Sequence, residues 1–465
     1  MIISTNTKAR PRAVYAHSKP IFRCIFVVTL VSVQWFSGRV LAADLLDIYH
    51  LAQKKDPTYE AGRYALESAQ EKQPQALANL LPQVLANANR NRNIGVYNFG
   101  ALPESERNVK ASGWTVQLTQ PLIRIQNWEN YSQAEFLVEQ ARARFALVEQ
   151  DLILRTAQAY FDFDIARESI FAADAQVLAV QQQLNLNKKG FIAGTLAITD
   201  VHEVQARLEL ARSQRVGTQN DLDSKSAELE KIIGFLPISL NSLRGDAELS
   251  FPDPNNVQYW IKQAREISPS VRLQRAAVGV AEKEISKNNA AHLPTLDLTA
   301  SYGRNYSSGN NTTIQDYDSR NRSTQIGLQL SIPLNSGGMV SSRVREATAQ
   351  FYQAKAELET AERLVATTAR QAFSGVSNGM AQIDALASAI ESSRHAVKGN
   401  QMGLKLGTRI NIDVLNAEQQ LYTSQRDLVK ARYGVLLQSL KLKAAAGQLF
   451  EIDISNLNLM FKATP

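Results

Sequence analysis

Hydrophobic residues recur every three or four positions along two long stretches of the chain, which is the period of an α-helix. The first stretch runs over about residues 126–187 and is followed by a shorter one over about 196–233. A second long stretch starts near Val344 and repeats the same alanine-rich seam. Residues 122–236 and 334–464 contain no proline, so nothing in these intervals interrupts a helix. The pattern predicts coiled-coil helices, the first on the order of 90 Å long.

The pattern changes to a period of two in four shorter segments, which is typical of β-strands with unlike faces. These segments begin near residues 83, 114, 295 and 325, and polar loops over about 93–112 and 304–322 join them in pairs. The predicted polar face holds Thr115, Gln117, Thr119, Thr299, Gln325 and Gln329, and the apolar face holds Val116, Leu118, Leu298, Ile326, Leu328 and Leu330. Such strands commonly cover a soluble core. Segments of about ten residues also suit a tilted crossing of a bilayer, and no other apolar layer is left to cover them, which favours lipid.

The order of these segments occurs twice. Asp56-Pro57 recurs as Ser268-Pro269 after 212 positions, and Gly194-Thr195 recurs as Gly407-Thr408 after 213. Each half is expected to begin with one helix, over about 44–79 and 256–291, and the long helices to turn at Lys188-Lys189-Gly190 and near 399–407. The pattern predicts two internal repeats, over 43–234 and 256–447, with a linker over 235–255 and a C-terminal segment over 448–465.

The first 42 residues have the pattern of a signal peptide. Five basic residues precede the apolar run 24–36, and Val40-Leu41-Ala42 is typical of a cleavage site, with Ala43 as the expected first mature residue. The single cysteine, Cys24, lies in this segment, so a disulfide, a thiolate metal site and a lipid-acceptor cysteine are not expected. No later stretch is apolar enough for a spanning helix, which leaves a soluble periplasmic, a secreted or a β-barrel protein.

Charge and motifs exclude several classes of function. Six of the 51 basic residues and none of the 44 acidic ones lie in residues 1–42, so the rest carries a formal charge of only +1, which gives no support for nucleic-acid binding. The sequence has no GxSxG, Walker A or HExxH motif, and the four later histidines are scattered, at His50, His202, His292 and His395. We expect no enzyme, no catalytic residue, no bound metal and no cofactor.

Four strands cannot close a barrel, because single-chain barrels begin at about eight strands and an open edge in lipid is costly. The strand count therefore predicts an oligomer, and a trimer would supply twelve strands.

Four segments resemble the TolC-like outer-membrane efflux and secretion channels: HLPTLDLTASYG (292–303), GTLAITDV (194–201), SIPLNSGGMVSSRVREA (331–347) and GTRINIDVLNAEQQLY (407–422). The resemblance covers almost the whole chain after the signal. It implies a mixed α+β membrane protein: a homotrimer with a 12-stranded β-barrel in outer-membrane lipid, continued by a coiled-coil tunnel through the periplasm. It also implies a periplasmic adaptor protein and an inner-membrane RND, MFS or ABC transporter as partners.

The resemblance also implies a gate at the periplasmic end. Arg409, Asp200 and Thr199 would form a tether, and Asp413 and Asn416 would line the pore constriction. The turns at Gly194-Thr195 and Gly407-Thr408 would lie at the tip, where the adaptor docks.

Two positions depart from the pattern of the family. Leu404 stands where a tethering tyrosine is expected, and Asn416 stands where a second pore aspartate is expected. How tightly the resting gate closes is therefore open. A local reading is that Asp200 and Asp413 only cap helices.

The cargo, small molecules or polypeptides, also stays open. A structural periplasmic coiled-coil protein without channel activity is the alternative function.

Overall fold

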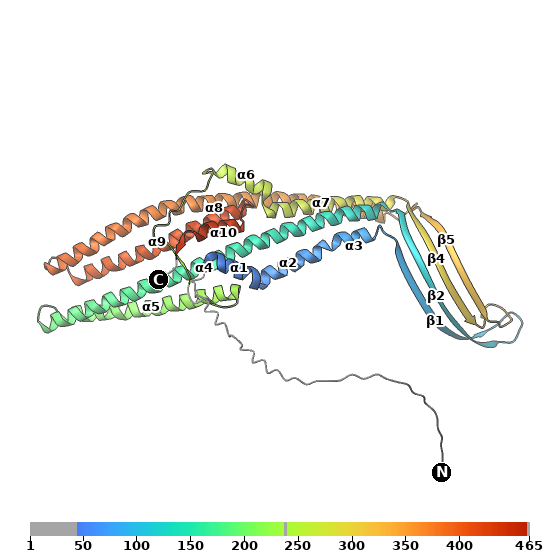
Figure 1. The fold of residues 1–465 in the computed structure, drawn as a ribbon, viewed down its shortest axis with the longest axis horizontal. Helices are drawn as coiled ribbons and strands as arrows, with labels where there is room; N and C mark the ends of the chain where they lie inside the picture. Colours follow the sequence, from blue (N-terminus) through green and yellow to red (C-terminus); the bar gives the residue numbers. More distant parts are fainter. Residues whose placement is uncertain (1–43, 237–239, 463–465) are drawn as a thin grey trace, which may run out of the picture. The chain divides into compact units, whose positions relative to one another are not determined.

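The computed structural model describes residues 44–236 and 240–462, and all of them belong to one unit, Ala42–Pro465. The predicted signal peptide and its cleavage site lie outside the described residues. In Figure 1 the sheet lies at one end of the long helices, and the helical hairpins end at the other. In the part of the chain described, no helix is both long enough and apolar enough to span a membrane.

The predicted opening helices are each divided, which corrects the expectation of one helix per half. The first is α1 (Leu45–Lys55), α2 (Pro57–Gln70) and α3 (Lys72–Ala78), and the second is α6 (Val257–Ile267), α7 (Pro269–Asn289) and the short 3₁₀ helix η1 (Ala290–His292). Asp56 ends α1 and caps α2 by accepting the Thr58 backbone N–H at 2.8 Å. Proline is favoured in the first turn of a helix and cannot continue a preceding one, so both Pro57 and Pro269 start new helices.

The long helices form two antiparallel hairpins, as predicted. The first hairpin is α4 (Ile125–Ile192) with α5 (Ile198–Ile233), and the second is α8 (Met339–Lys405) with α9 (Asn411–Ala445). The turn predicted at Lys188-Lys189-Gly190 is wrong, because these residues continue α4 and the chain turns after Ile192. Gly399 likewise lies within α8. Glycine inside a helix lowers its stability but does not end it.

The sheet has the antiparallel order β1-β2-β4-β5. Its strands are β1 (Gln83–Tyr97), β2 (Ser105–Ile123), β4 (Thr295–Ser308) and β5 (Ser319–Ser331). They are 13 to 19 residues long, so the expected length of about ten and the expected wide loops are wrong. The strands extend because backbone pairing continues past the apolar positions into polar residues. β1 and β5 are the edges of this sheet.

The register confirms the predicted grouping of polar and apolar side chains. Residues directly opposite each other in neighbouring strands lie on one face. Leu118 pairs with Ala300, which pairs with Ile326, and Leu298 pairs with Leu328. On the other face Thr119 pairs with Thr299. Counting by two along each strand places all six predicted apolar residues on the even-numbered face and all six polar ones on the odd-numbered face.

The largest buried cluster lies in the helical part and includes the chain after the repeats. Helix α10 (Glu451–Asn458) and strand β6 (Phe461–Lys462) pack there, and β6 pairs with β3 (Ser242–Leu243) of the linker. Phe461 stacks on Phe161 with ring centroids 6.1 Å apart. The predicted C-terminal segment, as far as Lys462, therefore packs with the core.

Candidate functional site at the helical tips

The turns at the ends of the two hairpins have the same geometry. Gly194 and Gly407 have φ values of 75° and 76°, in the left-handed region that glycine adopts at low cost. After each glycine a threonine bonds back to the preceding helix. The backbone N–H and hydroxyl of Thr195 donate to the Gly190 carbonyl at 2.9 and 3.0 Å, and those of Thr408 donate to the Gly403 carbonyl at 2.9 and 3.2 Å.

Asp200 and Asp413 begin the return helices in matching positions. The Asp200 carboxylate accepts the Ala197 N–H at 3.2 Å, and the Asp413 carboxylate accepts the Ile410 N–H at 3.5 Å. Both carboxylates face a helix N-terminus, where negative charge is favoured. The expectation that these residues cap helices is confirmed. Each capping bond uses only one of the two carboxylate oxygens.

A cavity of about 710 Å³ lies between the hairpins, and three residues of the predicted gate, Thr199, Asp413 and Asn416, do not line it. Asp200, Leu404 and Arg409 all line it. Arg409 is exposed and its guanidinium lies 3.7 Å from the carboxylate of Asp413. Among ion pairs of residues 44–236 and 240–462, none joins Arg409 to Asp200. Thr199 is exposed in the first turn of α5.

Two hydrogen bonds that the sequence did not predict join the hairpins near the tip. The Arg207 guanidinium of α5 donates to the side-chain carbonyl of Asn416 at 3.2 Å. The side-chain N–H of Gln183 on α4 donates to the side-chain carbonyl oxygen of Asn411 at 2.6 Å. Asn416, expected only as a pore residue, thus also connects α9 to α5. These partners are more than 200 positions apart, so no local pattern could have identified them.

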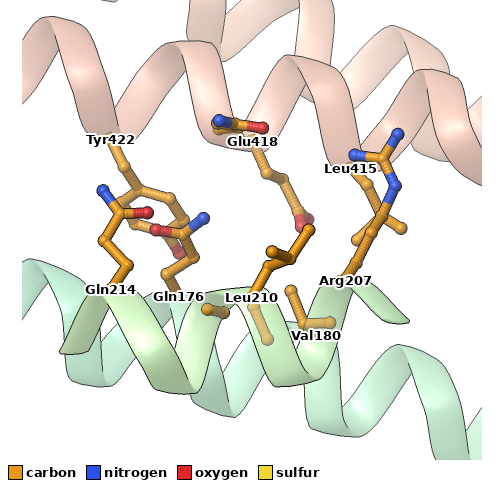
Figure 2. A pocket seen from close by; sticks show the side chains of 11 residues that line it. Gln176, Val180, Arg207, Leu210, Gln214, Leu415, Glu418 and Tyr422 are labelled. Carbon is orange, nitrogen blue, oxygen red and sulfur yellow. The ribbon is translucent and has the colours of Figure 1, made fainter. Parts of the chain in front are cut away.

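A smaller pocket of about 110 Å³ lies farther from the tip, between α9 and the first hairpin (Figure 2). Glu418 of α9 lines both this pocket and the tip cavity. Burial raises the pKa of Glu418, and a hydrogen bond from Gln401 opposes the shift. Burial and the nearby Glu418 carboxylate also raise the pKa of Tyr422. Leu415 beside them packs against an apolar cluster of the first hairpin.

A sheet with an exposed apolar face, joined to long helical hairpins, is the fold expected of an outer-membrane channel. In the described residues, no group of three or more His, Cys, Asp and Glu side chains could hold a metal ion.

The comparisons with known proteins agree with this class. The family described as "Outer membrane efflux protein" matches residues 48–235 and again 260–448. The proteases secretion protein PrtF of Dickeya chrysanthemi is 31% identical over 451 residues, which cover 94% of this chain and 96% of the relative. The outer membrane protein TolC of Escherichia coli is 30% identical over 434 residues, with 92% and 87% covered. The crystal structure of VceC from Vibrio cholerae has the same fold, with a TM-score of 0.73, 17% identity and 87% and 96% covered.

The chain belongs to the outer membrane efflux protein family. Membership confirms the predicted resemblance, an outer-membrane location, the function of an outer-membrane efflux or secretion channel, and the absence of enzymatic activity. It also removes the alternative of a purely structural coiled-coil protein.

Proposed function

We propose that three copies of this chain form a channel: a 12-stranded barrel in the outer membrane, continued by a helical tunnel through the periplasm. The observation that carries the proposal is the sheet, which has one exposed apolar face and two unpaired edges. Each unpaired backbone group in lipid costs several kcal/mol, so edges β1 and β5 need partners of the same kind. Pairing β5 of one copy with β1 of the next satisfies both edges.

The chain is an internal duplication in this proposal, with repeats over 43–234 and 256–447 and a linker between them. The family match in two consecutive parts supports this division. So do the matching bonds of the tips: the Asn187 amide donates to the Asp200 carbonyl at 3.3 Å, and the Asn400 amide donates to the Asp413 carbonyl at 3.1 Å.

The helical tips, including the cavity between them, are the proposed gate. Arg409, with Asp200 and Thr199, tethers the closed state, and Asp413 with Asn416 lines the constriction. Arg409 is exposed and lines the same cavity as Asp200, which supports the tether. One acidic residue per copy gives a ring of three carboxylates, which attracts cations in a narrow, partly desolvated passage.

The tip turns at Gly194-Thr195 and Gly407-Thr408 are the proposed docking points for a periplasmic adaptor, which connects the channel to an inner-membrane RND, MFS or ABC transporter. The cargo is small molecules or polypeptides. The name of PrtF refers to protease secretion, which supports polypeptide export as one of these uses.

Recordings in planar lipid bilayers test the gate. We expect Arg409→Ser to raise single-channel conductance severalfold, because it removes the tether, and Asp413→Asn to lower cation selectivity and block by multivalent cations. Lys54→Gln, an exposed site on α1, is the control and leaves both quantities unchanged. Wild-type conductance in Arg409→Ser together with wild-type selectivity in Asp413→Asn contradicts a gate at this site.

The oligomer is tested separately by the mass of the purified protein in detergent. Light scattering should give three times the mass of one chain, and a monodisperse monomer contradicts the barrel.

A further inference from the structure

The even-numbered face of the sheet has a second zone beyond its apolar residues. Toward the hairpin loops this face carries six basic side chains, and farther out on β1 it also carries Ile94 and Val96: the basic ones are Arg90, Arg92, Lys110, Arg304, Arg320 and Arg322. We call these six residues the basic belt. They come from all four strands, so the belt crosses the full width of the sheet.

The register places the belt next to the apolar residues. Trp114 pairs with Arg304, which pairs with Arg322. One step farther toward the loops Arg320 pairs with Tyr306, and Arg92 pairs with Lys110. One step toward the helices Tyr302 pairs with Val116 and with Thr324, and its ring meets that of Trp114 edge to face, with ring centroids 5.5 Å apart. Aromatic residues bordering an apolar zone are typical of the level of lipid headgroups.

The charges of the belt are not neutralised within the chain. All six side chains are exposed, and among residues 44–236 and 240–462 no ion pair involves any of them. The contacts they do make are to neutral groups. Arg92 donates to Asn108 at 2.8 Å, and the Arg320 guanidinium lies 5.5 Å from the Tyr306 ring. Within the four strands this face carries one carboxylate, Glu106, farther toward the loops, and Asp318, just before β5, accepts from Gly309 and Tyr306.

Six like charges on neighbouring strands repel one another, and like charges directly opposite in a sheet destabilise it. Arg304 opposite Arg322 is such a pair. An anionic partner removes this cost, and arginine matches phosphate because its planar guanidinium donates two parallel hydrogen bonds.

We propose that the basic belt binds the phosphate groups of the phosphorylated glycolipid in the outer leaflet, lipopolysaccharide. The inference rests on the proposed barrel, in which the even-numbered face meets lipid and the hairpin loops face the cell exterior. Each copy carries one belt, so a closed trimer has a continuous ring of basic residues at the outer headgroup level. The ring fixes the depth of the barrel in the membrane and its orientation.

Native mass spectrometry of the detergent-purified protein, titrated with lipopolysaccharide, tests the proposal. The test variant is Arg304→Gln with Arg322→Gln, and the charge-matched control is Lys54→Gln with Lys55→Gln on α1. Since each basic residue near an anionic surface contributes about 1 kcal/mol, two substitutions should weaken binding about 30-fold. The control should bind as the wild type does, and dephosphorylated lipopolysaccharide should bind weakly to all three proteins.

Three results contradict the proposal. The first is equal binding of lipopolysaccharide by the test variant and the wild type, and the second is equal binding of intact and dephosphorylated lipopolysaccharide. The third is displacement of the bound lipid by low millimolar inorganic phosphate, which identifies free phosphate as the ligand. If the double variant does not assemble, Lys110→Gln with Arg320→Gln replaces it. Planar-bilayer conductance of the same preparations tests the channel itself. Normal conductance with unchanged lipid binding contradicts only the belt, whereas absence of conductance in the wild type contradicts the proposed function.

Discussion

The sheet and the middle of the helical part use large apolar residues in opposite ways. In the helical part Tyr160 is 0% and Phe161 is 1% exposed, because α4, α9, α10 and β6 surround them. In the sheet Ile326, Leu328 and Leu330 are 74%, 65% and 61% exposed. One chain therefore covers its own core in the helical part, whereas the sheet depends on its surroundings. A large exposed apolar patch marks a surface that meets lipid or another protein.

The largest effect is expected in the covered region. Phe161→Ala removes a ring that contacts Tyr160, Tyr433 and Phe461, and leaves a cavity. Such substitutions cost about 3–5 kcal/mol, measured here as the free energy of unfolding of the helical part in detergent. Phe171→Ala in the same helix is the control, since Phe171 is 56% exposed, and should cost less than about 1 kcal/mol. Equal losses at both positions would show that α4 has no covered side.

The next effect distinguishes the two faces of the sheet. Leu328→Arg places a charge on the proposed lipid face and should cost roughly 2–4 kcal/mol near the bilayer centre, while Gln329→Arg on the opposite face should cost much less. The yield of folded protein in outer-membrane extracts measures both. Similar defects in the two variants would mean that protein, not lipid, covers both faces.

The smallest effect concerns Glu418, which lies at the boundary between the two hairpins. Its pKa is higher in the folded protein than the ordinary value of 4.5, because burial disfavours the charged carboxylate. The folded protein therefore binds this proton more tightly than the unfolded chain, and stability rises as the pH falls through the raised pKa toward 4.5.

Glu418→Gln removes that rise and changes the stability at neutral pH by no more than about 0.5 kcal/mol. Thermal unfolding between pH 4.5 and 7 measures how steeply the stability changes with pH. A variant that keeps the slope of the wild type would show that Glu418 is not its source.

The sequence predicted those features of the fold that depend on a single residue pattern. Alternation placed Leu118 and Ile326 on one face, and the absence of proline allowed α4 and α8 to be predicted. The sequence pattern failed at Arg304 and Arg320, which were predicted as loop, because both faces are polar there and the period of two vanishes although the backbone pairing continues. The tip residues followed from resemblance. The bond between Arg207 and Asn416 could not be predicted, because it depends on how two distant hairpins pack.

The central claim, that lipid covers the even-numbered face, is tested most directly at Trp114, which is 39% exposed there. Trp35 leaves with the predicted signal peptide, so a protein in which Trp128 and Trp260 are replaced by phenylalanine retains Trp114 as its one tryptophan. In bilayers of brominated phosphatidylcholine, bromine near the headgroup end of the acyl chains should quench its fluorescence strongly, and aqueous acrylamide should quench it weakly. Strong quenching by acrylamide with no effect of bromine would place Trp114 in water and contradict the account.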